Sequence, residues 1–214
     1  MHGRLIAMWS GPRNLSTALM RSFESRADTF VTDEPWYAPY LLETGMQHPG
    51  RAETLRAHET QPEALERWLC GVIPEGKSIW YQKQMAHHLL PETPRDWLEK
   101  IQHGLLLRTP EEVVASYAKV LSNPSPFDLG FPQQWELFQR FDQSLPVFES
   151  ADILQNPEDS LQKICASFDI PWDSCMLSWK AGKRKTDGAW APYWYANVEA
   201  STEFGPPKKG MVEV

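Results

Sequence analysis

The chain has 214 residues, of which 42% are hydrophobic and 23% charged, and this suits one domain over residues 1–214 with a sizeable core. Its formal net charge of -7 argues against nucleic acid as a partner, because nucleic-acid binders need surplus Lys and Arg to displace counterions from phosphates. No run approaches the ~18 apolar residues of a membrane span, and Cys70, Cys165 and Cys175 lack CxxC spacing, so we expect a cytoplasmic protein without membrane contact, disulfides or zinc.

The chain begins with an apolar run at residues 4–9, followed by Ser-Gly-Pro. Leu15, Leu19, Met20 and Phe23 then recur at helical spacing, which predicts a strand, a tight turn and a helix. Further strands are predicted at 30–32, 78–83 (SIWYQK), 104–108 (GLLLR) and 147–149. We expect the polar stretch 46–60 to be a mobile excursion, and likewise the tail from residue 200 within a C-terminal segment 183–214.

Three helices are predicted from their start signals. Thr93-Pro94 and Thr109-Pro110 each place a hydroxyl at the N-cap and proline at the first helical position, and Asn156-Pro157 uses an amide cap. Strands that alternate with helices predict an α/β fold of three layers, with a mainly parallel central sheet flanked by helices, as in P-loop NTPases. Ligands of such sheets bind beyond the carboxyl ends of the strands.

The loop after the first predicted strand has the features of an anion site. The first backbone N–H groups of the next helix and its dipole attract an anion, and Arg13, Ser16 and Thr17 add side-chain donors. In the GxxxxGKS/T pattern of nucleotide-binding loops, Ser16 stands at the second glycine and Thr17 at the lysine. A phosphate-transferring kinase is therefore the weaker interpretation, because that lysine pairs with the β and γ phosphates.

A second cluster lies in LLLRTPEEVVASYAK, where Arg108 ends a predicted strand and Ser116 follows eight residues later on a capped helix. Together, the two clusters resemble the sulfotransferase family that uses 3'-phosphoadenosine 5'-phosphosulfate (PAPS) as sulfuryl donor. The family loop has Lys or Arg, any residue, Gly, and two Ser or Thr; the matching residues here are Arg13, Asn14, Leu15, Ser16 and Thr17, with Leu15 in place of glycine. Arg108 and Ser116 match the family's 3'-phosphate signature.

The resemblance continues to the C-terminal part of the chain. The run FESADILQNPEDSLQKICASFDIP is similar to the family segment that leads into its last helices. The stretch RKTDGAW, which begins with Arg184 and Lys185, resembles the family's RKGxxGDW loop over the nucleotide and is one residue shorter. The resemblance implies a PAPS-dependent transferase that requires no metal and acts on the hydroxyl or amine of a small-molecule acceptor.

Sulfuryl transfer needs a donor clamp, stabilisation of the leaving phosphate oxygen, and a base for the acceptor proton. Arg13 is the candidate for charge stabilisation. Glu34 stands where some branches of the family place their base, and the aromatic residues after it would raise its pKa. His87 and His88 are alternative bases, since Met85 occupies the position of the histidine that other branches use. Lys83, at the end of a predicted strand, is expected either to touch the sulfate or to lie on the surface.

Aromatic residues near these motifs are candidates for an acceptor pocket. They are Trp36, Tyr37, Tyr40, Trp190, Tyr193, Trp194 and Tyr195. A protein that binds a phosphonucleotide without catalysis is the third interpretation, and the sequence leaves the acceptor and the oligomeric state open.

Overall fold

The computed structural model describes residues 3–117 and 124–206. Within this part of the chain, five parallel strands form one sheet in the order β2-β3-β1-β4-β5. Their bounds are β1 Arg4–Ser10, β2 Thr29–Asp33, β3 Ile79–Met85, β4 Gln102–Leu107 and β5 Val147–Glu149. The five strands predicted from the sequence are confirmed, with ends that differ by one or two residues. Strand β1 lies at the centre of the sheet, so the loop that follows it has neighbours on both sides.

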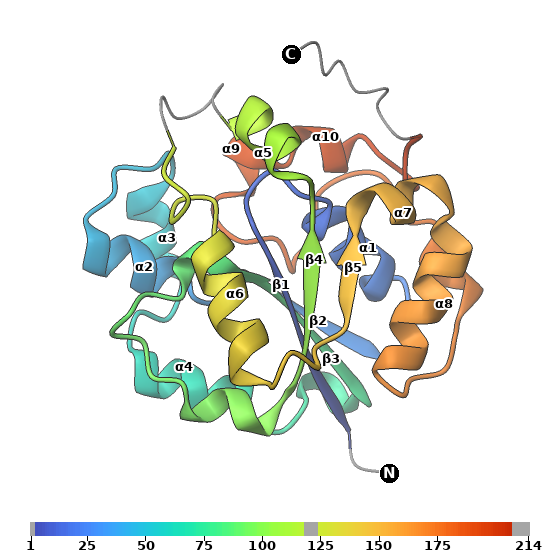
Figure 1. Cartoon of the computed structure of the whole chain (residues 1–214), viewed down its shortest axis with the longest axis horizontal. Coiled ribbons are helices and arrows are strands. Elements are labelled where there is room, and N and C mark those ends of the chain that lie inside the picture. The colour runs from blue at the N-terminus through green and yellow to red at the C-terminus, as the bar shows by residue number, and fades with distance from the viewer. Residues whose placement is uncertain (1–2, 118–123, 207–214) are drawn as a thin grey trace.

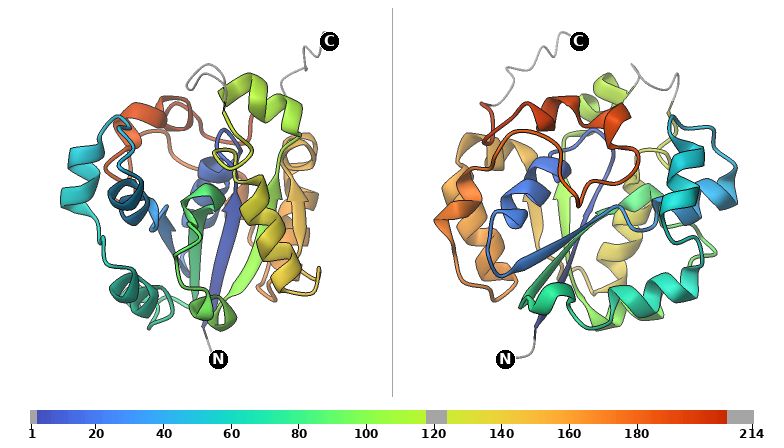
Figure 2. Two further views of the ribbon diagram at one scale, coloured as in Figure 1. Left: turned by 60° about the vertical axis from the view of Figure 1, so that its left-hand side comes forward. Right: turned by 180° about the vertical axis from the view of Figure 1, so that it is seen from behind.

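Helices cover both faces of the sheet, as the predicted three-layer α/β fold requires (Figures 1 and 2). Leu19, Met20 and Phe23 of α1 pack with the inner face of α8 on one side, whereas α4 and α6 supply Leu65 and Leu137 to the core on the other. The bounds of the helices are α1 Ser16–Glu24, α2 Tyr37–Thr44, α3 Arg51–Ala57, α4 Pro62–Leu69, α5 Pro110–Tyr117, α6 Phe131–Arg140, α7 Ser150–Gln155, α8 Pro157–Ser167, α9 Ala191–Trp194 and α10 Ala196–Glu199. Short 3-10 helices are η1 Pro74–Gly76, η2 Ala86–His88, η3 Asp96–Lys100 and η4 Ser174–Leu177.

Two of the three predicted helix starts are confirmed. Helix α5 begins at Pro110 and α8 at Pro157, where the Asn156 side chain accepts a hydrogen bond from the Asp159 amide. The third is wrong, because the chain after Thr93 forms only the 3-10 helix η3. The Trp97 indole donates to the Pro94 carbonyl at 3.0 Å. In an α-helix, this carbonyl would instead accept a hydrogen bond from a backbone amide.

The stretch expected to be an excursion at residues 46–60 contains helix α3, whose Thr54 is buried. The C-terminal segment also packs onto the domain, since Trp190, Tyr195 and Phe204 are buried. The two segments meet where the Tyr193 ring lies against Gly50, whose φ of 77° suits glycine. Residues 207–214 of the predicted mobile segment lie outside the described residues. Cys70, Cys165 and Cys175 are free thiols.

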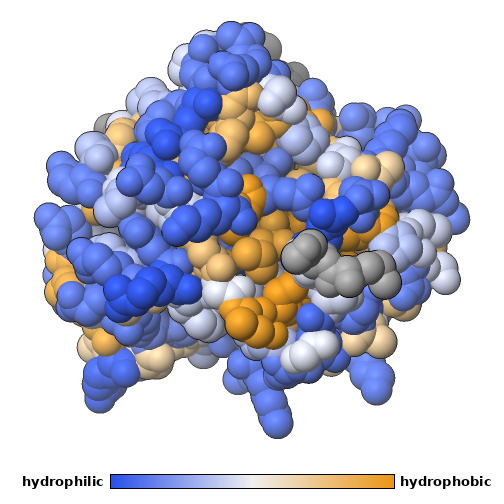
Figure 3. Space-filling view, turned by 90° about the horizontal axis from the view of Figure 1, so that it is seen from below, coloured by the Kyte–Doolittle hydropathy of each residue, from blue (hydrophilic) through white to orange (hydrophobic). Residues whose placement is uncertain are grey.

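The two ends of the sheet differ. Helices α5, α9 and α10 gather beyond the carboxyl ends of the strands, at the top of Figure 1. Figure 3 shows the opposite end, where an apolar area lies within a mostly hydrophilic surface. Val72, which precedes β3 at that end, is 93% exposed. The polar clusters predicted from the sequence all belong to the first end. In the described residues, no helix is long and apolar enough to cross a membrane.

Candidate functional site

The loop between β1 and α1, residues 11–15, lies beyond the centre of the sheet and leads directly into the buried Ser16. Arg13 has φ 58°, so the left-handed residue of this loop is an arginine. Leu15 has φ -82° and ψ 5°, which any residue adopts, and its side chain packs against the core. The loop therefore does not need the glycine that the family pattern has at this position. The first N–H groups of α1, including those of Ser16 and Thr17, have no carbonyl partner within the helix, and this is the helix end at which the sequence predicts an anion site.

Asn14 holds this loop against the neighbouring strand. Its amide donates to the Leu106 carbonyl at 2.9 Å, and its Oδ1 accepts from the Leu15 amide at 2.7 Å and from the Ser150 hydroxyl. Ser150 also donates to the Leu107 carbonyl at 2.8 Å. Asn14 was predicted to bind the nucleotide, and these contacts give it a structural role in positioning the loop. Sequence reasoning missed Ser150, whose only signal is its place directly after β5.

Three predicted anion-binding residues lie together at the ends of β1 and β4. The Arg13 Nε atom donates to the Ser116 hydroxyl at 3.2 Å, and Arg108 Nη1 donates to the Arg13 carbonyl at 2.7 Å. Arg108 is also paired with Glu112 at 3.1 Å, one turn along α5. Arg13 is exposed and the Arg108 side chain is 27% exposed, so solvent reaches both guanidinium groups. The cluster thus offers two fixed cations and a hydroxyl beside the start of α1.

A buried charge cluster occupies the neighbouring strands β3 and β2. The Lys83 Nζ atom lies 2.9 Å from Asp33 Oδ1, 2.5 Å from Glu34 Oε1 and 2.7 Å from the Tyr195 hydroxyl. The side chains of Lys83 and Asp33 are each 1% exposed, and that of Glu34 is 12% exposed. The prediction left open whether Lys83 is a surface residue, and this alternative is wrong. Asp33 and Tyr195 complete the cluster. Asp33 was not predicted to belong to the site, and Tyr195 was predicted only as a candidate for an acceptor pocket.

The electrostatics of this cluster follow from two carboxylates that share one buried ammonium group. Burial would lower the pKa of Lys83, but Asp33 and Glu34 raise it, so the amine stays charged. Burial raises the pKa of Glu34, and the charge of Asp33 adds to this effect while Lys83 opposes it. Glu34 also has φ 38°, an unusual backbone for a glutamate, and its amide donates to the Lys83 carbonyl at 3.0 Å. A carboxylate with a raised pKa is suited to accept a proton.

Tyr195 connects the C-terminal segment to the charge cluster. Its hydroxyl donates to Asp33 at 2.8 Å and accepts from Lys83 and from the Trp190 indole, the latter at 3.1 Å. Asp33 also accepts the Gly188 amide at 3.1 Å. Burial raises the pKa of Tyr195 well above its ordinary value, so the phenol stays neutral. Asp33 therefore fixes both the Lys83 side chain and the C-terminal segment that carries Gly188 and Tyr195.

His87 and His88 lie beyond the end of β3 in a layer of aromatic rings. His88 stacks on Tyr37 at 4.7 Å between ring centroids, and the edge of His87 meets Tyr40 at 5.6 Å. Burial, helped by His48, lowers the pKa of His87 to about 3, so its imidazole is neutral. The described hydrogen bonds include none from either histidine to the Lys83 cluster.

Arg184 pairs with the end of α1 that lies away from Arg13. Arg184 pairs with Glu24 at 3.4 Å, and its amide donates to Asp187, which is itself paired with the buried Arg21. Glu24 ends α1, and the nine residues of that helix place it about 12 Å from the anion-binding turn. Lys185 is exposed.

The predicted acceptor-pocket aromatics divide into two groups. Trp36, Tyr37, Trp190 and Tyr195 are packed in the core, whereas Tyr193 is 50% exposed and Trp194 is half-buried. Tyr40 lines a cavity of about 190 Å³. In the part of the chain that the structure describes, no three His, Cys, Asp or Glu side chains are grouped so that they would hold a metal ion.

A family model described as "Sulfotransferase domain" matches residues 4–214. The chain belongs to this sulfotransferase family. Among solved structures, the sulfotransferase domain from the curacin biosynthetic pathway is 14% identical, with a TM-score of 0.57 over 94% of this chain and 84% of that one. A sulfotransferase from Alicyclobacillus acidocaldarius is 11% identical, with a TM-score of 0.57 over 80% and 83%. At these identities the likeness shows the fold, and the predicted P-loop-like α/β class is confirmed.

Two Arabidopsis thaliana proteins are similar to the chain in matches 209 residues long, which cover 96% of the chain. They are named "Branched-chain-amino-acid aminotransferase-like protein 1" and "2", and are 38% and 35% identical. The chain spans 37% of the length of each of these relatives.

Proposed function

We propose that the chain is a PAPS-dependent sulfotransferase for a small acceptor that carries a hydroxyl or an amine. The observation that carries this proposal is the convergence of Arg13, Arg108 and Ser116 on the start of α1, next to the buried pair of Lys83 and Glu34. Membership of the sulfotransferase family supports the proposal. The open basic cluster would hold the donor anion, and the buried pair would handle the acceptor proton.

The proposed sulfuryl transfer needs few protein side chains. The acceptor oxygen attacks the sulfur atom of PAPS, the bond from sulfur to the 5'-phosphate oxygen breaks, and adenosine 3',5'-bisphosphate leaves with that electron pair. Glu34 takes the acceptor proton, since its raised pKa favours proton uptake. The N–H groups at the start of α1 and the Arg13 guanidinium would stabilise the charge that develops on the leaving oxygen. Lys83 would fix the Glu34 carboxylate.

The first test uses sulfur-labelled PAPS with a panel of small alcohols, phenols and amines. We expect label in an organic sulfate product with at least one acceptor and stoichiometric release of adenosine 3',5'-bisphosphate. Phosphate-labelled ATP serves as the matched donor control. Transfer of labelled phosphate from ATP, with none from PAPS, would replace this proposal with the kinase alternative. Tight binding of PAPS without turnover across the panel would favour the non-catalytic alternative.

A further inference from the structure

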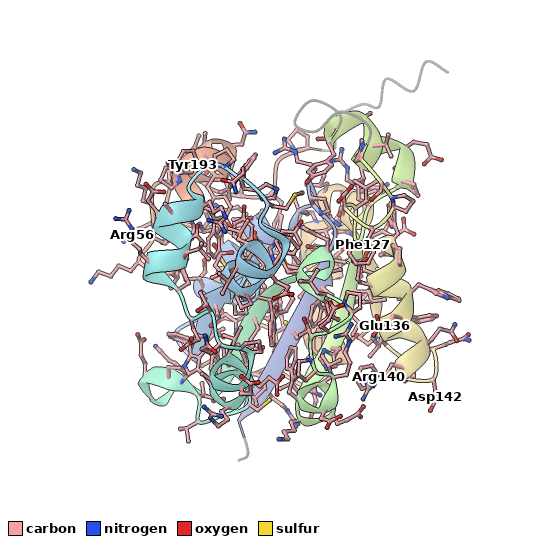
Figure 4. The ribbon with its side chains drawn as sticks, turned by 90° about the vertical axis from the view of Figure 1, so that its left-hand side faces the viewer. Arg56, Phe127, Glu136, Arg140, Asp142 and Tyr193 are labelled. Atoms are coloured by element: carbon pink, nitrogen blue, oxygen red, sulfur yellow. The ribbon has the colours of Figure 1, made fainter. Side chains whose placement is uncertain are left out.

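A small cavity lies between α2, η2 and the segment that leads into α6. Its volume is about 190 Å³, below the roughly 300–1,000 Å³ of sites for drug-sized ligands, so it suits a molecule of a few heavy atoms. It is lined by Tyr40, Thr44, Met46, His87, Leu90, Phe127 and Asp128. Figure 4 labels Phe127 near the start of α6, opposite the helices that carry Arg56 and Tyr193.

Asp128 is the only charged residue among the described residues that line this cavity. Its Oδ2 atom accepts hydrogen bonds from the Ser125 amide at 2.9 Å and the Ser125 hydroxyl at 2.7 Å, which fixes the carboxylate. Burial lowers the pKa of His48 despite the nearby charge of Asp128, and that of His87 is also low. The cavity therefore combines the Asp128 carboxylate with the uncharged imidazole of His87 and the aromatic rings of Tyr40 and Phe127.

A second feature points to a ligand at the same place. His87 is 6% exposed, and its Nδ1 atom is buried without a hydrogen-bond partner among the described residues. Buried polar atoms are nearly always paired, so this ring nitrogen is an unusual feature of a residue that forms one wall of the cavity. The imidazole of His87 is neutral and does not repel a cation.

We propose that this cavity binds a substituted ammonium group of the acceptor, so that the acceptor class is a small amino alcohol. The inference rests on the function proposed above. Aromatic faces and a carboxylate together favour an organic cation, whereas a neutral ligand would remove water from Asp128 without pairing it. His87 follows Lys83 by four residues, so the cavity lies at the same end of the sheet as Lys83 and Glu34.

The test compares two alcohols of nearly equal shape, the trimethylammonium compound 2-(trimethylammonio)ethanol and its uncharged carbon isostere 3,3-dimethylbutan-1-ol. With labelled PAPS, we expect kcat/KM to be roughly 5- to 30-fold higher for the cation, which corresponds to ~1–2 kcal/mol for a desolvated cation beside aromatic rings. Asp128→Asn should remove most of that preference and leave the isostere unaffected, because an asparagine oxygen can still accept the Ser125 hydrogen bonds. Asp142→Asn, at an exposed position with φ 51°, is the matched control.

Equal or better use of the isostere by the wild-type chain would overturn the inference, and so would an unchanged preference in Asp128→Asn. If no acceptor is sulfated at all, the proposed function fails, and the cavity is then judged by binding alone. Saturation-transfer NMR without donor should detect the trimethylammonium alcohol on the wild-type chain and a weaker signal on Asp128→Asn. Equal NMR signals from the two alcohols would overturn the cavity assignment independently of turnover.

Discussion

The two halves of the site differ in how they hold charge. At the ends of β1 and β4, Arg13 and Arg108 are open to solvent and contact each other through a backbone carbonyl. At the ends of β2 and β3, Lys83 and Asp33 are almost completely buried, and every charged group there has a charged partner. The first arrangement leaves donors available to a ligand. In the buried half, Lys83 already donates to Asp33, Glu34 and Tyr195, and the charges of this cluster influence the pKa of Glu34.

This difference matches the two tasks of a transferase. In the open half, an incoming anion competes with water and with the partly exposed Glu112 carboxylate for the two guanidinium groups. The buried half shields the Glu34 carboxylate from most of the solvent, and this burial raises its pKa. A substitution in one half should therefore change the property assigned to that half and leave the property of the other half intact.

Glu34→Gln should have the largest effect on activity. Loss of a general base lowers turnover by ~10²–10⁴-fold, while donor binding in the other half is kept. In the wild-type chain, activity should fall as the pH drops through the raised pKa of Glu34, because the protonated carboxyl cannot accept the acceptor proton. The acidic limb of the kcat profile should therefore lie above the ordinary carboxyl value of ~4.3. Undiminished turnover would transfer the role of base to His87 or His88.

Lys83→Met should destabilise the fold. The substitution leaves Asp33 and Glu34 buried without their cation, and the loss of one partner of a buried pair costs ~3–5 kcal/mol. Urea unfolding followed by tryptophan fluorescence measures the change. Lys100→Met, at an exposed position, is the control and should show no comparable loss. If the two variants unfolded at the same urea concentration, the cluster would not be held by its ion pairs.

Arg13→Ala should affect the open half alone. Removing a charged donor to a bound anion costs ~1.5–3 kcal/mol, so the affinity for adenosine 3',5'-bisphosphate should drop about 10- to 100-fold. The free energy of unfolding should stay near that of the wild type, because Arg13 is exposed. Arg56→Ala on α3, where the side chain is 76% exposed, is the matched control for loss of a positive charge. Unchanged affinity in Arg13→Ala would remove the arginine from the anion site.

Leu15→Gly should have the smallest effect. The backbone at Leu15 needs no glycine, so restoring the family residue should leave nucleotide affinity within about twofold of the wild type. The partly buried side chain is lost, which should lower the free energy of unfolding by about 1 kcal/mol. A large gain in affinity would mean that the leucine distorts the loop.

Much of the open half could be predicted from the sequence. Parallel strands bring their carboxyl ends to one edge, so residues that follow two strands, such as Arg13 and Arg108, are expected to meet although they are 95 residues apart. The replacement of the family glycine by Leu15 does not disturb the loop, because the residue with left-handed backbone is Arg13 and not Leu15.

The buried half was harder to predict. Lys83 and Glu34 were identified singly, but the pairing of Asp33 with Lys83 depends on the register of β2 against β3, which no local pattern specifies. Tyr195 comes from 112 residues beyond Lys83, on a segment whose path is set by tertiary packing. The pairing of Arg184 with Glu24 could not be predicted either, because the two residues are far apart in the sequence and meet through tertiary packing.

The central claim is that Arg13, Arg108 and Ser116 form a site for a phosphoadenosine donor and not for a nucleoside triphosphate. Isothermal titration calorimetry of the wild-type chain with adenosine 3',5'-bisphosphate and, separately, with ATP and magnesium tests it most directly. We expect the bisphosphate to bind at least tenfold more tightly. Equal affinity, or tighter binding of ATP, would contradict the assignment.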